Sequence, residues 1–265
     1  MSSYINVPIA PRAQDARRTE SVKLYGPDAF EGMRNVGGLT AACLDDLADI
    51  VAPGIPLSEI NSYILDFAAS HNAIPATLGY KGYKYACCTS VNHVVCHGFP
   101  NEKKLRDGDI VNVDVTLILD GWHGDSSRMY LVGKPKRAAE RLIQVTHEAM
   151  MLGIKAVGPG ARLGDIGHAI QSHAQSKRCS VVRDFCGHGI GQVFHDSPNI
   201  LNFGKVGDGL ELREGMIFTV EPMVNLGRGE VRMLANDWTA VTRDRSLSAQ
   251  FEHSIGVTAD GFEIF

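Results

Sequence analysis

The stretch VNVDVTLILDGWHGDSS, residues 111–127, decides the fold around which the rest of this chain is arranged. Over residues 110–119 the odd positions are all apolar, whereas the even positions include polar side chains such as Asp114. A period of two is typical of a strand with one core face and one polar face. The Asp-Gly pair at 120–121 then predicts a two-residue hairpin turn and a second strand that returns antiparallel to the first.

This register places Thr116 opposite Asp125, so that Asp125 lies on the polar face, diagonal to Asp114. Diagonal positions have Cα atoms roughly 7–8 Å apart, and both carboxylates can therefore reach one small object between them. Two ionised carboxylates held that close repel each other, so a shared proton, a basic partner or a cation is expected. A solvated edge hairpin with polar residues outside is the alternative, and this stretch alone does not decide between the two.

The composition is that of an ordinary globular chain. Of its 265 residues, 44% are hydrophobic and 21% are charged, which allows one large α/β domain or two small ones. The net charge of −4 argues against a nucleic-acid-binding face. No apolar run approaches the roughly 18 residues of a membrane span, and the N-terminus lacks a signal-peptide hydrophobic region. We therefore expect a cytoplasmic protein without a nucleic-acid or membrane partner.

The cysteines and histidines differ in what they predict. None of the six cysteines belongs to a CxxC pair, so disulfides and zinc ribbons are not expected. Several histidines lie beside glycine, as His97 does in CHG and His188 does in GHGIG. Glycine next to histidine lets the backbone and a ligand come close. The run GHGIG is not a nucleotide-binding fingerprint, because the GxGxxG spacing fails.

Two segments of the chain repeat at nearly the same offset. APGIPLSEI at 52–60 and GPGARLGDI at 158–166 share a proline, a glycine, a leucine, an acid and an isoleucine in register. NVD at 112–114 has a counterpart in TVE at 219–221, and the two offsets differ by one residue. Either match alone would be weak, but together they indicate duplicated halves.

Each repeat follows the same order of elements. Apolar residues at helical spacing predict helices over 38–51 and from 57 to 68, then again over 140–157 and from 163 to 170, with a Pro-Gly turn inside each pair. Predicted strands follow each helix pair. The sequence therefore predicts an α+β arrangement in which two similar halves pack their sheets side by side.

The domain division follows from this repeat. Residues 1–22, which are rich in proline and arginine, are predicted to be a flexible N-terminal extension that belongs to neither half. Residues 23–265 are predicted to form a single domain, with halves of about 23–137 and 138–265.

Further acidic and imidazole groups stand in strand or glycine-bounded contexts. Glu221 lies in FTVEPMV, His188 in GHGIG, and Glu252 alternates onto a small and polar face in QFEHSIGV. A cleft between the halves would receive Asp114 from one half and Glu221 from the other. An oxygen-rich set with one histidine suits Mn²⁺, Fe²⁺, Co²⁺ or Zn²⁺. Because the acids are too many for one closed site, we expect two metals roughly 3.5–4 Å apart.

The motifs closely resemble those of type I methionine aminopeptidases, in peptidase family M24, of the short bacterial-type architecture. The matching blocks, in family order from about Leu24 to the C-terminus, are SVNHVVCHGFP, DGDIVNVDVT, DGWHGDSSRMYLVG, CGHGIGQVFHDSP, GMIFTVEPMVN and DRSLSAQFEHSI. The resemblance implies the pita-bread fold, in which two pseudo-symmetric halves surround a central dinuclear metal cleft. It also implies a monomer.

The resemblance further implies a function and a mechanism. A methionyl aminopeptidase removes the initiator methionine from the N-termini of nascent polypeptides, near the ribosome exit, when the second residue is small. Hydroxide between the two metals would attack the first peptide carbonyl, and Glu221 would help to move its proton. His97 would assist the leaving group, and His195 would stabilise the tetrahedral intermediate. The implied metal ligands, of which Asp125 and Glu252 bridge, are Asp114, Asp125, His188, Glu221 and Glu252.

A pocket for the methionine side chain is implied as well. Apolar and aromatic walls suit a flexible thioether through dispersion and sulfur–aromatic contact. One departure from the family pattern is His93, where many relatives carry an acid, and it should alter the pocket rim or a nearby cation site without removing a metal ligand. The implied substrate-binding residues are His97, His195, Tyr80, Tyr83, Cys88, Phe194 and Trp238.

Two other functions fit parts of the pattern. A proline-specific aminopeptidase or dipeptidase would use the same metal set on X-Pro bonds, although such relatives usually carry a larger N-terminal domain. A non-catalytic protein could keep the fold to dock nascent chains or ribosomes. Proteins of that kind normally lose metal ligands, whereas all five are retained in this sequence.

Overall fold

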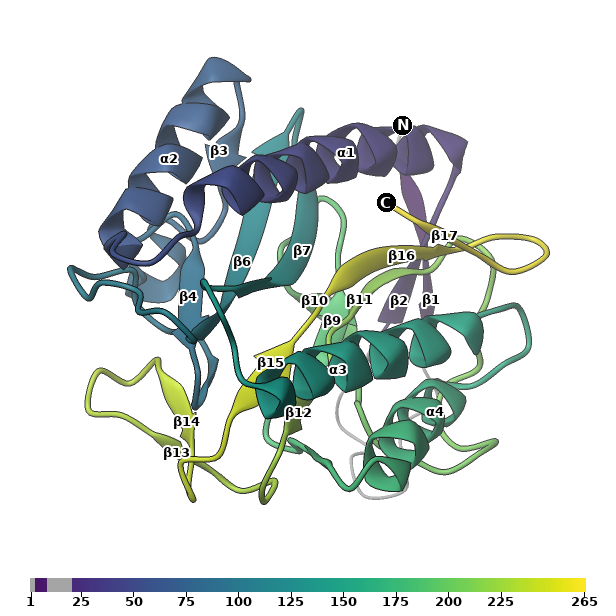
Figure 1. Ribbon diagram of the computed structural model, residues 1–265. Helices are drawn as coiled ribbons and strands as arrows, with labels where there is room; N and C mark the ends of the chain where they lie inside the picture. The colour runs from purple at the N-terminus through teal and green to yellow at the C-terminus, as the bar shows by residue number, and fades with distance from the viewer. Residues whose placement is uncertain (1–2, 9–20) are drawn as a thin grey trace.

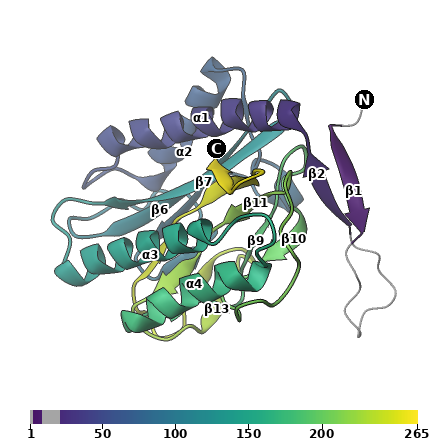
Figure 2. The ribbon, with the colours of Figure 1, turned by 90° about the vertical axis from the view of Figure 1, so that its right-hand side faces the viewer.

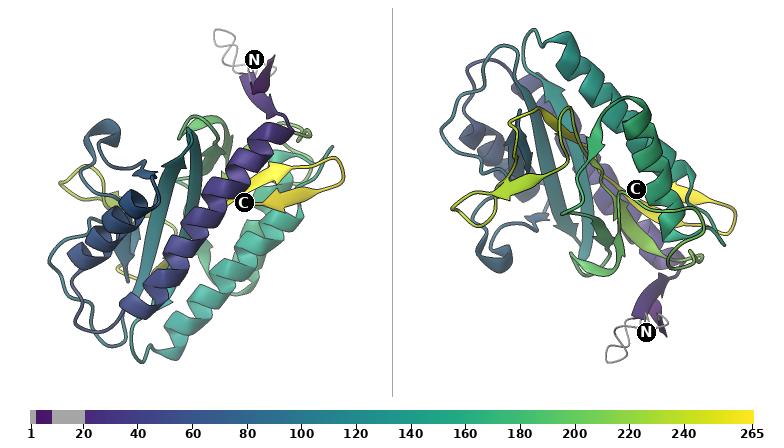
Figure 3. Two further views of the ribbon diagram at one scale, coloured as in Figure 1. Left: turned by 90° about the horizontal axis from the view of Figure 1, so that it is seen from above. Right: turned by 90° about the horizontal axis from the view of Figure 1, so that it is seen from below.

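Four α-helices lie in two pairs within residues 3–8 and 21–265, which are the residues that the computed structural model describes (Figure 1). They are α1 (Pro27–Ile50), α2 (Leu57–Ser70), α3 (Arg137–Lys155) and α4 (Leu163–Ser176). Seen from above, α1 and α3 run alongside each other over the strands (Figure 3). The two predicted helix pairs are confirmed, although α1 begins well before the predicted residue 38.

The first turns of α1, before the predicted residue 38, pack closely on their neighbours. Pro27 opens the helix at a position whose backbone N–H would be unpaired in any case. Glycines then occupy positions where the helix touches its neighbours. A Cβ at Gly32 would lie 2.4 Å from the ring of Trp122, and a Cβ at Gly37 would lie 2.5 Å from the backbone of Phe265. Around these glycines, Phe30, Met33 and Val36 are buried and continue the apolar helical spacing towards the N-terminus, so the pattern that marks the early start is present in the sequence.

The predicted hairpin is present in the first half. β6 (Ile110–Leu119) and β7 (Trp122–Leu131) pair antiparallel, with Thr116 opposite Asp125 as predicted. The turn residues 120–121 have φ angles of 51° and 81°. Positive φ at both central positions is what a type I′ turn requires, and its twist matches that of the flanking strands. The register that brings the two aspartates to one face is thus set by the Asp-Gly turn.

Shorter strands complete the sheets. Their bounds are β3 (Ile74–Pro75), β4 (Cys88–Val91), β5 (Val94–Cys96), β8 (Ser180–Val181), β9 (Gly187–Gly189), β10 (Asp196–Ile200), β11 (Ile217–Val220), β12 (Met223–Asn225), β13 (Val231–Met233), β14 (Ala240–Thr242), β15 (Ser248–Gln250), β16 (His253–Val257) and β17 (Phe262–Ile264), with a 3₁₀ turn at Tyr80–Gly82. In the first half, β6 pairs with β7 along its whole length and with β4 and β3 at successive positions. The second-half sheet has the order β10-β9-β11-β16-β17. Two three-stranded sheets, β15-β12-β8 and β13-β14-β5, flank them.

The halves are joined where β7 meets the start of β16. The Ser127 N–H donates to the Glu252 carbonyl at 3.3 Å, and the Glu252 N–H donates to the Ser127 carbonyl at 3.2 Å. The Ser254 hydroxyl adds a hydrogen bond of 2.8 Å to the carbonyl of Asp125. This seam therefore runs through two of the residues predicted to bind metal.

Each half has its own hydrophobic core. α1 and α2 pack on the apolar face of β6, where Met33 and Val115 are fully buried. α3 and α4 pack on β11 and β16, where Met150 and Phe218 are fully buried. Two separate cores with matching helix pairs agree with the predicted α+β arrangement of similar halves.

The start of the chain forms a two-stranded hairpin at the edge of the molecule (Figure 2). β1 (Tyr4–Pro8) pairs antiparallel with β2 (Ser21–Tyr25), and Tyr4 lies opposite Tyr25. Part of the predicted extension, residues 1–22, is therefore an ordered strand. Residues 1–2 and 9–20 lie outside the described residues, and the flexibility predicted for the extension and the division at residue 22 stay predictions.

In the part of the chain that the structure describes, no helix combines the length and the apolar character that crossing a membrane requires.

Helix α1 and strand β7 should tolerate no side chain between them at Gly124. A Cβ there would lie 2.8 Å from the backbone of Val36 and 2.9 Å from the hydroxyl of Thr40. We expect Gly124→Ala to lower the free energy of unfolding of the metal-free protein by about 1–3 kcal/mol, the usual cost of overpacking. Urea denaturation with an unchanged m-value measures the effect.

Gly38→Ala is the matched control, because Gly38 lies in α1, the helix that packs on Gly124, and an added Cβ at Gly38 would meet no atom within 4 Å. Alanine in a helix interior should raise stability there by roughly 0.5–1 kcal/mol. Equal effects of the two substitutions would contradict the close packing of α1 on β7.

Candidate metal centre and substrate pocket

Three predicted ligands converge at the seam between the halves. Asp125, His188 and Glu252 each offer one ligand atom, and these atoms all lie within 4.8 Å of one another, in the only such group found among the described residues. The three residues are at most 8% exposed. Asp125 comes from β7, His188 from β9, and Glu252 from the bridge to β7. Strand pairing, and not loop conformation, therefore fixes their backbones.

Glu221 and Asp114 join the same cluster. The Nε2 atom of His188 lies 3.6 Å from Oδ2 of Asp125 and 3.7 Å from Oε1 of Glu221. Burial is the largest cause that raises the pKa of Asp125, Glu221 and Glu252, and Asp114 lies close enough for its charge to raise each of them further. The structure thus brings all five predicted ligands together, while metal binding by each of them stays a prediction.

The carboxyl groups of this cluster resist ionisation. Burial raises the pKa of Asp114 to about 7, and burial together with the charge of Asp114 raises the pKa of Glu221 to about 8. The pKa values of Asp125 and Glu252 lie well above their usual range, from burial and then from neighbouring carboxylates. A divalent cation would remove the repulsion and allow full ionisation near neutral pH. The donor set therefore fits divalent metal.

His188 presents a lone pair to the cluster. Burial lowers its pKa to about 4, so the ring is neutral near pH 7. Its Nδ1 lies 3.1 Å from the carbonyl oxygen of Gly189, which can only accept. The ring proton therefore resides on Nδ1, and Nε2 is free to bind a metal.

Neutral donors orient the carboxylates. The Thr116 hydroxyl donates to Oδ1 of Asp125 at 2.7 Å. The Thr219 hydroxyl donates to Oε1 of Glu221 at 3.0 Å, and Nε2 of Gln250 donates to Oε2 of the same group at 3.3 Å. None of these three residues was predicted to be functional from the sequence. Thr116 could have been found from the hairpin register, whereas Gln250 comes from a distant strand.

One aromatic group lies around His97. The rings of Tyr83 and Trp238 meet edge to face at 4.9 Å, and the His97 ring lies 6.1 Å from that of Trp238. Phe185 meets His97 edge to face at 5.5 Å and was missed by the sequence analysis. Cys88, which is 5% exposed, pairs with Asp114 across β4 and β6 and so links this group to the metal ligands.

The backbone of His97 is unusual, with a φ of 54°. A non-glycine residue rarely adopts this left-handed conformation and needs surrounding contacts to hold it. The Thr239 hydroxyl donates to the His97 carbonyl at 3.1 Å, and Gly98 follows in close contact with Thr89. These contacts aim the imidazole at a fixed position.

A second aromatic group lies around His195. Its ring stacks on Tyr80 at 5.0 Å, contacts Phe194 at 4.1 Å and lies 4.2 Å from the ring of His188. Tyr80 and Phe194 also meet at 4.9 Å. The predicted substrate residues therefore form two aromatic groups beside the carboxylate cluster, one around each histidine, and their substrate contacts stay predictions.

The chain is similar in sequence and fold to known metallopeptidases. The pattern of metallopeptidase family M24 matches residues 31–259. The chain is a member of this family. It is 58% identical over 246 residues to the methionine aminopeptidase of Rickettsia prowazekii, covering 92% of this chain and 95% of that protein. The methionine aminopeptidase of Escherichia coli K12 is 46% identical over 92% of this chain and 93% of its own length.

Solved structures agree with this membership. A crystal structure of the Rickettsia prowazekii methionine aminopeptidase matches with a TM-score of 0.91, over 92% of this chain and 98% of that one. The prolidase from Pyrococcus furiosus, at 16% identity and a TM-score of 0.73, shares the fold over 91% of this chain and 64% of its own. The predicted resemblance and the pita-bread fold of the M24 family are confirmed, and the chain belongs with the methionine aminopeptidases of that family.

His93, the departure from the family pattern, lies outside the carboxylate cluster. Its carbonyl accepts the Thr242 N–H at 2.9 Å, which ties β5 to β14. Burial, followed by the charges of Lys103 and Arg245, lowers the pKa of its imidazole. The neighbouring cations therefore favour the neutral form of the His93 imidazole.

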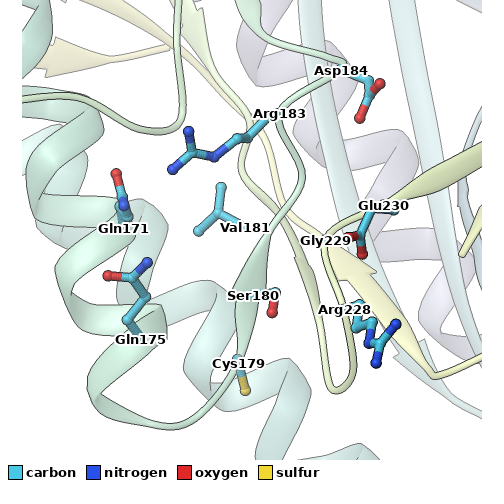
Figure 4. Close-up of a pocket in the computed structure, with 10 residues that line it drawn as sticks. All are labelled: Gln171, Gln175, Cys179, Ser180, Val181, Arg183, Asp184, Arg228, Gly229 and Glu230. Carbon is cyan, nitrogen blue, oxygen red and sulfur yellow. The ribbon is translucent and has the colours of Figure 1, made fainter. Parts of the chain in front are cut away.

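A separate surface cavity of about 540 Å³ opens between α4 and the loop at 228–230 (Figure 4). It contains none of the predicted ligands or pocket residues. Its rim carries both charge signs, with Arg183 and Arg228 opposed by Asp184 and Glu230. The cavity is therefore separate from the candidate metal centre.

The metal-free protein should become less stable as pH rises. A carboxyl group whose pKa is higher in the folded than in the unfolded protein stabilises the fold fully below its unfolded pKa of about 4. That stabilisation is lost as the pH rises through the pKa of the folded protein. For Asp114 and Glu221 the folded pKa values are about 7 and about 8. We expect a lower melting temperature at about pH 9 than at about pH 6 with chelator, and little such loss with excess Mn²⁺. Thermal unfolding followed by circular dichroism measures both.

Asp125→Asn tests the origin of this effect. It removes one buried charge and keeps the acceptor for Thr116. The metal-free variant should melt above the parent protein at about pH 8, while its stabilisation by Mn²⁺ should shrink. Asp120→Asn, in the exposed hairpin turn, should change neither quantity. An Asp125→Asn protein that kept full stabilisation by Mn²⁺ would contradict the ligand assignment.

Proposed function

We propose that this chain is a methionyl aminopeptidase that hydrolyses the bond after an N-terminal methionine when the second residue is small. The observation that carries the proposal is the meeting of five ligand-type residues, four of them buried, with two aromatic groups at one seam, in a chain 58% identical to a methionine aminopeptidase. We further propose that it works in the cytoplasm as a monomer on the N-termini of nascent polypeptides, near the ribosome exit.

Two divalent ions, of cobalt, manganese, iron or zinc, would be held by the cluster. The proposed ligands are Asp114, Asp125, His188, Glu221 and Glu252, with Asp125 and Glu252 shared between the ions. When bound, such ions lower the pKa of water and polarise a carbonyl group at neutral pH. Support comes from an excess of buried acids for a single closed site and from the neutral Nε2 of His188.

Glu221 would accept the proton released when water attacks the first peptide carbonyl. Thr219 and Gln250 donate to its two oxygens and hold the carboxylate in one orientation. Cluster acids near the free N-terminal amine would fix which end of the peptide enters.

The two histidines would act as neutral hydrogen-bond donors. Burial, then the neighbouring His188 and Lys81, lower the pKa of His195 to about 3, and burial lowers that of His97. A neutral imidazole N–H can stabilise the developing oxyanion, the role proposed for His195. His97, fixed by its backbone, would assist the departing amine.

The methionine side chain would enter between the two aromatic groups. Phe194 and Tyr80 offer ring faces on one side, and Tyr83, Trp238 and Cys88 offer apolar surface on the other. An unbranched thioether gains dispersion and sulfur–aromatic contact in such surroundings. Proline-specific cleavage receives less support, because the likeness to prolidases is one of fold alone.

Peptide assays test the activity directly. With Mn²⁺, Co²⁺ or Fe²⁺ restored after chelation, Met-Ala-Ser should lose its methionine, whereas Met-Lys-Ser and Ala-Pro-Ser should remain largely intact. Good cleavage of Ala-Pro-Ser without methionine release would favour the proline-specific alternative. Tight peptide binding without turnover, with metal supplied, would favour a non-catalytic docking protein.

Asp114→Asn should lower kcat/KM for Met-Ala-Ser by more than roughly 100-fold, because even partners outside the ligand set are commonly worth 10–100-fold. His93→Ala should retain most activity, since His93 lies outside the cluster and serves as the matched control. Full turnover by the Asp114→Asn protein would refute its assignment as a ligand.

A further inference from the structure

The loop that carries Phe194 and His195 is bracketed by contacts from the start of the chain. Before these residues, the Ser3 hydroxyl donates to Oε1 of Gln192 at 3.1 Å. After them, Nζ of Lys23 lies 2.7 Å from Oδ2 of Asp196. Ser3 directly precedes β1, and Lys23 lies in β2, which pairs with β1. The hairpin and the residue before it therefore touch the loop on both sides of the proposed pocket residues.

The ion pair between Lys23 and Asp196 is partly buried, with side chains 17% and 29% exposed. β1 provides part of that burial, because Nζ of Lys23 also lies 4.7 Å from the ring centre of Tyr4. A cation beside an aromatic face is attracted to it and loses water on that side. Tyr4 in turn meets the ring of Tyr25 edge to face at 5.6 Å. The position of the lysine thus depends on the N-terminal strand.

Tyr25 presses on the same loop from β2. A Cβ at Gly191 would lie 2.5 Å from the Tyr25 hydroxyl oxygen, so the loop backbone and the phenol are in direct contact. On its other side the loop is held by His123, whose N–H donates to the Gly191 carbonyl at 2.8 Å and whose ring stacks on Phe194 at 5.8 Å. The loop is therefore clamped between β7 and the N-terminal hairpin.

We propose that β1 and Lys23 form a clamp that positions the Phe194–His195 loop for catalysis, with Lys23 as a positioning residue. The inference rests on the substrate roles proposed for Phe194 and His195. Release of the clamp leaves the carboxylate cluster intact, because none of the strands that carry the ligands depends on β1 for its pairing. Release of the clamp changes instead how well the Phe194 ring and the His195 imidazole contact the substrate.

Lys23→Met is the first test, because it keeps the length of the side chain and removes the charge that Asp196 binds. We expect kcat for Met-Ala-Ser to fall roughly 10-fold and KM to rise, since small displacements of positioned groups are costly in rate. Affinity for Mn²⁺ should stay at the parent value. Lys23→Arg, which restores the cation, should recover most of the lost rate, and Tyr4→Leu should act in the same direction as Lys23→Met.

Arg34→Met is the matched control. It breaks an exposed ion pair with Glu263 that lies away from the loop, and it should leave kcat, KM and Mn²⁺ affinity unchanged. His195→Ala, measured in parallel, separates the two proposals. If it lowers kcat while Lys23→Met and Tyr4→Leu stay within about twofold of the parent, the clamp is overturned and the proposed function stands.

Two other results would also overturn the clamp. Unchanged turnover in the His195→Ala protein would show that His195 has no catalytic role, and the clamp proposal rests on that role. Equal impairment of Lys23→Met and Lys23→Arg, with a reduced melting temperature in both, would assign the effect to general destabilisation. Recovery by the exchanged pair Lys23→Asp with Asp196→Lys, relative to either single change, is the expected result and requires a direct interaction between the two positions.

Discussion

Repulsion among buried carboxyl groups is the constraint on which the centre of this molecule depends. Four acids surround one neutral imidazole at the seam, away from water, and only protons or cations can offset their mutual charge. The fold keeps them there because both strands of the seam are tied by backbone hydrogen bonds at Ser127 and Glu252. Neutral donors such as Thr116 and Thr219 orient the oxygens without adding charge. The backbone hydrogen bonds of the seam hold the acids together against this repulsion, and a divalent cation would offset it.

The proposed ligands and the proposed pocket residues are supported in different ways. The ligands lie in or beside strands, whose register is fixed by a hairpin turn and by two cores. Phe194, His195, Tyr80 and Trp238 lie in connecting segments, where the backbone has fewer hydrogen bonds of its own. Their positions depend on contacts from elsewhere, including the N-terminal hairpin. The proposed ligands are therefore held by strands, whereas the proposed pocket residues need contacts from other parts of the chain to hold them in place.

Local signals in the sequence predicted much of this arrangement. The alternation before Asp-Gly fixed the register of Asp114 and Asp125, and the repeated Pro-Gly turns predicted two similar halves. The start of α1 was predicted too late, because glycines at 32, 37 and 38 interrupt the apolar spacing that Phe30, Met33 and Val36 carry. Phe185 and Gln250 were missed for another reason. Their contacts join segments far apart in the chain, so that their position beside the blocks of His188 and Glu252 did not reveal what they touch. The family motifs supplied the rest of the candidate site.

The distribution of the ligand-type residues between the halves bears on how such a molecule could have arisen. One half contributes Asp114 and Asp125, and the other contributes His188, Glu221 and Glu252. If the chain descends from a duplicated gene, a lone ancestral half would have held only an incomplete set of ligands. Such an ancestor would have needed to associate with a second copy of itself to capture the metal. The present seam would then correspond to a former subunit interface. Once the two copies were joined in one chain, the sequence of each could change independently of the other.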